Sequence, residues 1–342
     1  MNPLLLIIGT VLIIVLYLLL MPKIGLVSRL MKLNKDRNRV LIEDALKHLY
    51  DCEYKNVDCS LNSLSGSLFI NGAKAALLIT RLEAMNLITS HENKIFLTSE
   101  GRIYALKIVR IHRLWEKYLA DNTSEHETDW HAIAEKREHE TTFEEAKKLS
   151  AKLGNPLIDP HGDPIPSEIG EIPDREGVTL NNLESGCFAI ILHIEDEPKE
   201  VYAQISALKL YPGMQIYLLE NSNEIIRFVA DLEECVLAPV LASNITVTRI
   251  EEKIEIKSSY EILSSLKQDE EAVVMGISKA MRGQQRRRLL DFGIVPGTIV
   301  KSQLRSLSDD PVGYEIRGAI IALRKNQSDL IYIKRMKERK AA

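Results

Sequence analysis

The sequence predicts an α+β chain of several domains: a transmembrane helix, a winged helix-turn-helix, an all-α domain rich in potential metal ligands, and two small β-barrels. Three observations lead to this prediction. An uncharged apolar run opens the chain, apolar residues recur at helical spacing over residues 40–155, and short alternating runs separated by turns dominate from residue 178 on. With 342 residues, the chain has room for two to four compact cores.

The first segment, residues 3–21, carries no charge and is long enough to cross the ~30 Å hydrocarbon core of a bilayer as a helix. A secretory signal peptide is the alternative, but no basic region precedes the run and no A-x-A-like cleavage site follows it. Six basic residues and one acid lie within residues 23–39, so the positive-inside rule places the rest of the chain in the cytoplasm. Residues 24–33 lie along the membrane surface or form a plain linker.

Helical spacing continues over residues 40–50, 60–68 and 72–85, and alternation at 87–101 predicts two short strands around a polar turn. Three helices and a β-ribbon of this size are typical of a winged helix-turn-helix. Its third helix offers Asn71, Lys74 and Arg81 for contacts with DNA, which is a small set for reading base edges. A scaffold that binds proteins instead of DNA is the alternative.

Histidines and glutamates recur at helical spacing between residues 112 and 139. His112 and Glu116 are one turn apart, and a second helix carries His131, Glu135, Glu138 and His139 at i, i+4, i+7 and i+8. Two carboxylates about 4 Å apart repel by roughly 4 kcal/mol at an effective dielectric near 20, which favours a cation between them. Oxygen and imidazole ligands without thiolate suit Mn²⁺ or Fe²⁺. A solvated, charged helix face is the alternative.

A proline-rich segment separates the helices from the β-rich part. Residues 153–174 hold five of the twelve prolines, which excludes a helix and predicts an extended linker or an ordered turn, with His161 at the surface. Two runs of short strands follow, each predicting a barrel of about five strands. They repeat the same order about eighty residues apart, and Pro212-Gly213 is matched by Pro296-Gly297.

Composition restricts the class of protein further. The net charge of −4 gives no global field for nucleic acid, so any basic surface is local. The basic groups at 286–288 and 334–340 are interpreted as a solvated helix face and a tail. The four cysteines form no C-x-x-C pair, which predicts reduced, packed thiols. No nucleophile motif or phosphate loop accompanies the histidines and glutamates, so no enzyme is expected.

Three stretches carry a family resemblance: residues 112–119 (HRLWEKYL), the H-x-x-x-E-x-x-E-H run at 131–139, and residues 155–166 (NPLIDPHGDPIP). With the order of domains, they make residues 40–250 resemble the diphtheria-toxin-repressor and manganese-transport-regulator family of bacterial metal-dependent transcription factors. Both barrels resemble the FeoA-type fold. The apolar and basic runs at the start predict a membrane anchor at 1–22, which the family lacks, and a basic juxtamembrane linker at 23–39. The resemblance implies a winged helix-turn-helix at 40–101, a helical metal-binding and dimerisation domain at 102–155, a proline-rich linker at 156–177, and FeoA-like barrels at 178–250 and 251–337.

The resemblance also implies roles for individual residues. Glu135, Glu138 and His139 match the primary metal ligands, and Asp44 matches a ligand from the first helix of the DNA-binding domain. His112, Glu116 and His131 match an ancillary site, to which the first barrel is expected to add Glu197 or Glu200. Lys47 stands where the manganese-type arrangement has a second carboxylate.

Two functions are therefore considered. The first is a membrane-tethered, Mn²⁺- or Fe²⁺-responsive regulator that binds double-stranded operator DNA as a homodimer, located at the bacterial cytoplasmic membrane with its soluble domains in the cytoplasm. The second is a cytoplasmic metal-sensing module that regulates or assists a membrane metal transporter by protein contact without reading DNA.

Overall fold

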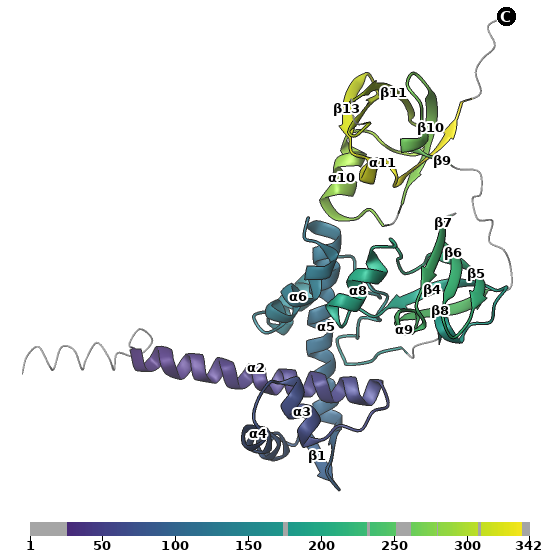
Figure 1. Cartoon of the computed structure of the whole chain (residues 1–342). Coiled ribbons are helices and arrows are strands. Elements are labelled where there is room, and N and C mark those ends of the chain that lie inside the picture. The colour runs from purple at the N-terminus through teal and green to yellow at the C-terminus, as the bar shows by residue number, and fades with distance from the viewer. Residues whose placement is uncertain are drawn as a thin grey trace, which may run out of the picture. The chain divides into compact units, whose positions relative to one another are not determined.

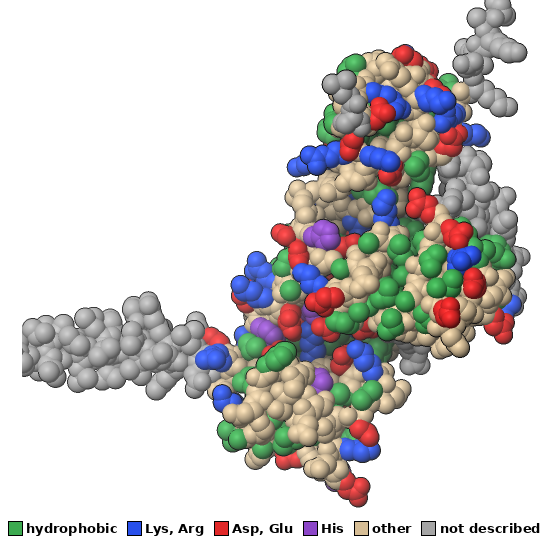
Figure 2. Space-filling model, viewed as in Figure 1, with side chains coloured by type: hydrophobic (Ala, Val, Ile, Leu, Met, Phe, Trp, Pro, Cys, Tyr) green, Lys and Arg blue, Asp and Glu red, His purple; other side chains and the backbone are tan. Residues whose placement is uncertain are grey.

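The computed structural model of the chain describes residues 26–173, 177–230, 233–250, 261–278, 280–306 and 309–336, with side chains from residue 36 on (Figure 1). The chain divides into two compact units. The first holds the chain up to Ile111 together with His139–Phe143 and Pro166–Glu171, and the second holds His112–Glu138, Glu144–Ile165 and the chain from Ile172 on. Figure 2 shows acidic and basic side chains interleaved over the visible face, as a nearly balanced charge predicts.

The first unit opens with three helices and a two-stranded ribbon, in the predicted order. These are α2 (Leu26–Tyr54), α3 (Leu61–Ser67), α4 (Gly72–Ala84), β1 (Ile88–His91) and β2 (Lys94–Leu97). Helix α2 begins well before residue 40, so from Leu26 on the predicted linker is helical. The sequence explains this difference, because residues 26–39 contain neither proline nor glycine and are rich in leucine, lysine and arginine.

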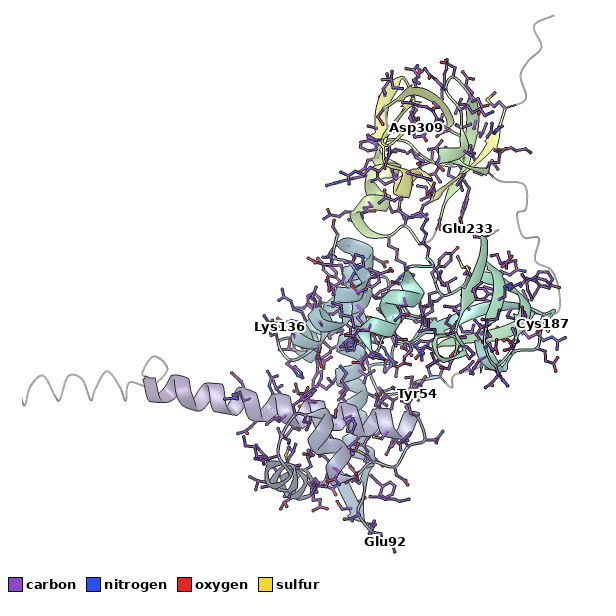
Figure 3. The ribbon with its side chains drawn as sticks, viewed as in Figure 1. Tyr54, Glu92, Lys136, Cys187, Glu233 and Asp309 are labelled. Carbon is purple, nitrogen blue, oxygen red and sulfur yellow. The ribbon has the colours of Figure 1, made fainter. Side chains whose placement is uncertain are left out.

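A small core holds these elements together. Helix α2 buries Ala45, Leu46 and Leu49 along one face, and α4 buries Leu78 and Leu82. Burying each leucine stabilises the fold by about 1.5–3 kcal/mol. In the ribbon Ile88 pairs with Leu97 and His91 with Lys94, leaving Glu92 and Asn93 at the tip with positive φ (Figure 3).

Three further helices follow the ribbon: α5 (Ser99–Asn122), α6 (Trp130–Glu138) and α7 (Phe143–Lys152). A short 3-10 turn, Glu127–Asp129, precedes α6. Helix α6 buries Trp130, Ala134 and Glu138, which are spaced at i, i+4 and i+8. His139 lies in the turn after the helix, so the predicted nine-residue helical stripe is one residue too long.

The proline-rich segment forms an ordered turn. Asp159 Oδ1 accepts hydrogen bonds from the backbone N–H groups of His161, Gly162 and Asp163, at 2.8 to 2.9 Å. His161 is only 2% exposed, so its predicted surface position is wrong. The reason is that this turn packs against the first β-rich part of the chain, where Ile194 N–H donates to the carbonyl of His161 at 2.9 Å.

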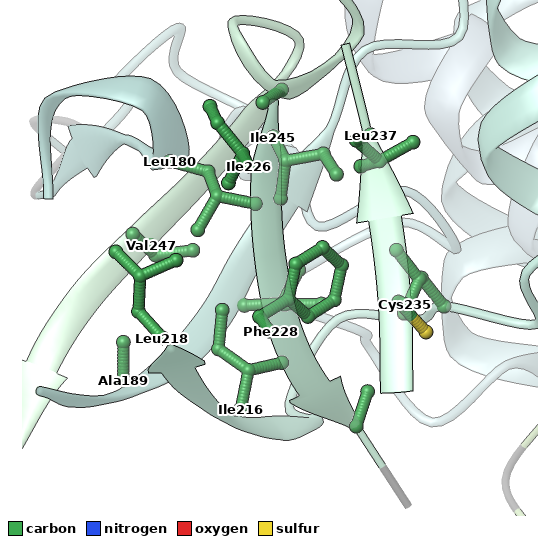
Figure 4. Close-up of a cluster of buried hydrophobic side chains, with 14 of the residues drawn as sticks. Leu180, Ala189, Ile216, Leu218, Ile226, Phe228, Cys235, Leu237, Ile245 and Val247 are labelled. Carbon is green, nitrogen blue, oxygen red and sulfur yellow. The ribbon is translucent and has the colours of Figure 1, made fainter. Parts of the chain in front are cut away.

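The first β-domain, residues 177–250, is a six-stranded sheet in the order β3-β8-β4-β5-β6-β7. Its strands are β3 (Val178–Thr179), β4 (Phe188–Ile194), β5 (Gln215–Asn221), β6 (Ile226–Ala230), β7 (Glu233–Leu237) and β8 (Ile245–Ile250), with helices α8 (Lys199–Ser206) and α9 (Pro239–Ala242). All neighbouring strands are antiparallel. Figure 4 shows the core, in which Phe228 lies among Ile216, Leu218 and Ile226.

The second β-domain, residues 261–336, repeats this arrangement with the order β13-β12-β11-β10-β14-β9. Its elements are β9 (Glu261–Ile262), β10 (Glu271–Ile277), α10 (Gly283–Asp291), β11 (Ile299–Arg305), β12 (Val312–Ile316), β13 (Ala319–Leu323), α11 (Lys325–Ser328) and β14 (Ile331–Arg335). Gly213 and Gly297 have φ of 87° and 91°, and each donates its N–H to a carbonyl of the preceding long strand, Ile191 or Val274. The predicted duplication is confirmed, with six strands in each copy instead of five.

The predicted membrane span at residues 1–22 lies outside the described residues. Among the helices that are described, none combines the length and the apolar character needed to cross a bilayer.

Candidate metal centre

One group of candidate ligands lies within the first unit, around His139. Its Nε2 is 2.9 Å from Asp44 Oδ1 and its Nδ1 is 2.7 Å from Glu43 Oε2. Two consecutive residues of α2 therefore hold opposite edges of one imidazole ring. Asp44 and His139 are both partly buried, so this pair stays within reach of an ion from solvent.

Glu43 was not predicted, although it is the more buried of the two carboxylates, at 3% exposure. Tyr104 donates its hydroxyl to Glu43 Oε1 at 3.1 Å, and burial together with the charge of Glu43 raises the pKa of Tyr104 to about 12. Arg39 lies 3.8 Å from Glu43 and donates to the carbonyl oxygen of His139 at 2.6 Å. A carboxylate that accepts from the second nitrogen of a metal-binding histidine fixes the orientation of the ring.

A second group lies within the second unit, around His112. Its Nδ1 is 2.5 Å from Glu138 Oε2, and its Nε2 is 3.0 Å from Glu116 Oε1 and 3.3 Å from His131 Nδ1. His112, Glu116 and Glu138 are all at least 95% buried. Carboxylates buried so deeply require a proton, a paired cation or a metal ion.

The first β-domain contributes two acids to this group from the segment before α8. Asp196 Oδ2 is 2.9 Å from His131 Nδ1, and Glu197 Oε1 is 3.1 Å from His131 Nε2. Of the two acids expected there, Glu197 is placed at the site, and no contact ties Glu200 to it among the described residues. Asp196 was not predicted, because only the fold shows which acid before α8 faces the helices.

Electrostatics prepare this second group for a cation. Burial raises the pKa of Glu116, but His112 and His131 outweigh burial and hold it well below the ordinary range. Burial lowers the pKa of His131, but hydrogen bonds to Asp196, Glu116 and Glu197 raise it to about 12. Without metal, His131 therefore carries a proton in the position that a cation would take.

His161 adds another donor from the proline-rich turn. Among the described residues, neither of its ring nitrogens has a hydrogen-bond partner, although the side chain is buried between the rings of Trp130 and Tyr202. Its Nε2 is 3.9 Å from Asp196 Oδ2, and donor atoms of His161, Asp196 and Glu116 lie within 4.8 Å of one another. A buried imidazole without partners is costly, and an ion would supply the missing bond.

Glu135, predicted as a primary ligand, joins neither group among the described residues: it is exposed on α6. It follows Ala134, which lies on the buried row, so its side chain is rotated by about 100° away from that row. His131 shares its side of the helix but is covered by Asp196 and Glu197.

The residues predicted to contact DNA lie on or before α4. Asn71 is the N-cap of α4, where its side-chain oxygen accepts a hydrogen bond from Lys74 N–H at 2.9 Å. This oxygen is therefore already used to cap the helix. Lys74 and Arg81 are exposed on the helix surface.

Comparison with known proteins adds to these observations. Residues 98–167 match the family described as iron dependent repressor, metal binding and dimerisation domain, and residues 262–335 match the FeoA domain. The iron-dependent repressor IdeR of Mycobacterium leprae is 29% identical over 166 residues, 44% of this chain and 72% of that protein. A probable metal transport system membrane protein of Chlamydia trachomatis is 40% identical over 80 residues, 23% of this chain and 18% of that protein.

A solved structure, a manganese-dependent transcriptional repressor in complex with manganese, has a TM-score of 0.57 and 25% identity, covering 61% of this chain and 99% of that chain. The helices and donor groups thus lie in a segment similar to the metal-binding and dimerisation domain of iron-dependent repressors, and the second β-domain is similar to a FeoA domain. The chain is similar to proteins named iron-dependent repressor IdeR and diphtheria toxin repressor, and these similar proteins are transcriptional repressors rather than enzymes, as expected.

Proposed function

We propose that this chain is a transcriptional regulator that binds Mn²⁺ or Fe²⁺ and, in response, binds operator DNA as a homodimer. The observation that carries the proposal is the cluster of His112, Glu116 and His131 within the matched metal-binding and dimerisation domain. Its donors are carboxylate oxygen and imidazole nitrogen, which suit Mn²⁺ and Fe²⁺ better than a thiophilic ion.

Two ion sites are proposed. One uses Asp44 and His139, which are 2.9 Å apart with Glu43 behind the ring. The other uses His112, Glu116 and His131, with Asp196 from the first β-domain. His161 is a candidate ligand beside this second site.

The Asp44–His139 site connects metal binding to the reading of DNA. Asp44 lies on α2, which packs with α3 and α4, and His139 follows the end of α6. An ion held by both ties α2 to the turn that holds His139, so that binding energy for metal contributes to binding energy for DNA. In a two-fold dimer, paired α4 helices with Lys74 and Arg81 fit two half-sites one helical turn apart.

We also propose that residues 1–22 anchor the regulator in the bacterial cytoplasmic membrane as a single span. The support is the uncharged run followed by basic residues. Deletion of residues 1–22 is expected to move the protein from the membrane fraction to the supernatant. Continued sedimentation with membranes would show that residues 24–33 bind them independently.

The second candidate function is regulation of a metal transporter by protein contact. The similarity over 80 residues to a Chlamydia trachomatis metal transport system membrane protein favours it. In this case the metal sites stay, but DNA binding is absent.

Fluorescence anisotropy tests the proposal directly. The full chain in detergent is titrated onto DNA from upstream of its own gene, with and without Mn²⁺, across a series of salt concentrations. Metal-dependent binding with a steep salt slope, tighter than on random DNA, supports the regulator. Measurable metal affinity with equal, weak binding to both DNAs would reject it in favour of the transporter partner.

A further inference from the structure

A second type of donor cluster lies at the C-terminal end of α2, within the helices that precede the ribbon. His48 and Cys52 are one turn apart on α2, and Cys59 lies in the loop that leads to α3. One donor atom of each lies within 4.8 Å of the others. Tyr54 marks this end of α2 in Figure 3.

The distances in this cluster match those of a tetrahedral ion site. Cys52 Sγ is 3.7 Å from His48 Nε2. Zinc bonds of about 2.3 Å to sulfur and about 2.0 Å to nitrogen place two tetrahedral ligand atoms about 3.6 Å apart. The two donors on α2 are therefore already at ligand separation, and the loop carries the third.

Ser63, on α3, closes the cluster on its fourth side. Its hydroxyl is 2.7 Å from His48 Nε2 and 3.6 Å from Cys59 Sγ. An ion bound to His48 Nε2 would replace the hydrogen bond between this nitrogen and the hydroxyl. The hydroxyl would then bind the ion as a fourth ligand or leave that position to water.

The surroundings of the two thiols differ. Both are buried, Cys52 at 9% and Cys59 at 4% exposure. Burial and the neighbouring Cys59 raise the pKa of Cys52 to about 12. Burial also raises the pKa of Cys59, but hydrogen bonds from His48, Cys52 and Ser63 outweigh it and bring the pKa below its ordinary value. Cys59 is thus the easier of the two thiols to deprotonate, and a bound metal ion would deprotonate both.

We propose that His48, Cys52 and Cys59 bind a thiophilic ion of the Zn²⁺ class, at a site that differs in chemistry from the oxygen-and-imidazole sites described above. Sulfur ligands select Zn²⁺ or Cu⁺ over Mn²⁺ and Fe²⁺. The imidazole distinguishes this cluster from two packed thiols, because packing alone requires no nitrogen aimed at the sulfurs. Residues 55–58 of the connecting loop are exposed and offer a route for the ion.

An ion here would tie α2 to the α2–α3 loop. The same loop is bound to the ribbon, since Ile95 N–H donates to the carbonyl of Cys59 at 2.9 Å. The site therefore stabilises the helices that carry α4, and its effect is separate from that of Mn²⁺ or Fe²⁺ at His112 or His139.

The test uses the full chain in detergent, reduced and metal-free, titrated with Co²⁺ as a spectroscopic probe and then with Zn²⁺. A thiolate-to-Co²⁺ charge-transfer band that saturates at one equivalent per chain and is removed by Zn²⁺ is expected. Cys52→Ala and Cys59→Ala should each lose the band. Cys187→Ala and Cys235→Ala, which remove buried thiols of the first β-domain, should keep it.

Two controls keep this result interpretable. Ser63→Ala should retain the band, because it removes the competing hydroxyl and no sulfur. Mn²⁺ binding by the Cys59→Ala protein should equal that of the unmodified chain, which separates this site from the proposed regulatory sites and reports correct folding. The proposal is wrong if the band is absent, if it survives in both cysteine variants, or if Cys52 and Cys59 are joined in a disulfide and bind no ion after reduction.

Discussion

Glu43 and Asp44 are neighbours on α2 with different tasks at His139. Asp44 faces the nitrogen assigned to the ion, and Glu43 accepts from the other nitrogen. Glu43→Gln is expected to lower Mn²⁺ affinity by about 10- to 100-fold, the usual effect of losing a carboxylate behind a histidine ligand. Calorimetric titration measures the change.

Lys47 provides the control for this prediction, since it lies on the same helix one turn beyond Glu43. Lys47→Ala should bind Mn²⁺ as the unmodified chain does. Equal Mn²⁺ affinities in Glu43→Gln and Lys47→Ala would show that Glu43 does not support His139 in binding the ion.

His131 makes metal binding depend on pH. Its folded, metal-free pKa of about 12 means that it is protonated at neutral pH, and an ion must displace that proton. Mn²⁺ affinity at this site should therefore rise about tenfold per pH unit for each proton released, between pH 6 and 8. Calorimetry in buffers of different ionisation enthalpy counts the protons, and His131→Gln should abolish this release.

The same shift has a consequence for stability without metal. The pKa of His131 is raised above its unfolded value of about 6.5, so its stabilising contribution is complete below pH 6.5 and is lost as pH rises toward 12. Metal-free protein should thus lose stability in alkali, and His131→Gln should show less of this loss in thermal melts.

At the residue scale the sequence predicted most residues of the two donor groups but could not assign their partners. Spacing placed His112 and Glu116 on one face, and Asp44 followed from the family resemblance. Glu43 was missed because only the fold shows which of two adjacent acids is buried. His161 was misjudged because a proline-rich segment is usually exposed, whereas this one packs on a sheet.

At the scale of elements, the turn at residues 159–163 depends on a glycine. Gly162 has φ of 98°, and an added Cβ would lie 1.9 Å from the carbonyl oxygen of Leu192. Gly162→Ala is expected to destabilise the protein by more than about 1 kcal/mol, because it combines strain with a clash that the backbone must move to relieve. Chemical denaturation measures this loss.

Gly186→Ala is the matched control for that substitution. It has φ of 81° in the first β-domain, but no atom of the described residues lies within 4 Å of its added Cβ. Gly186→Ala should therefore lower the free energy of unfolding only by the cost of the backbone strain. If both variants lose equal stability, close packing of the turn on β4 contributes nothing.

Element boundaries were harder to predict than element types. Helix α2 extends to Leu26 because nothing in residues 26–39 interrupts it, and α6 ends at Glu138, one residue short of the predicted stripe. Glu138 is therefore the last residue of the helix, buried beside His112, whereas His139 lies in the turn that follows, beside Asp44. Helical periodicity alone cannot show this division.

At the scale of the whole molecule, the sequence gives the order of domains, because each carries its own periodicity. The repeat was detectable from Pro212-Gly213 and Pro296-Gly297, where the same turn geometry recurs. The grouping of His48, Cys52 and Cys59 was not detectable from the sequence. The two cysteines are seven residues apart and come together only when the loop folds back on α2.

The central claim is that this chain couples metal binding to DNA binding through a single coupling free energy. Linkage requires that DNA increase metal affinity by the same factor by which metal increases DNA affinity. The decisive measurement is the Mn²⁺ dissociation constant of the full chain with and without saturating operator DNA. We predict equal factors of at least about fivefold in both directions, lost in Asp44→Asn. A Mn²⁺ affinity that is identical with and without DNA would contradict the account.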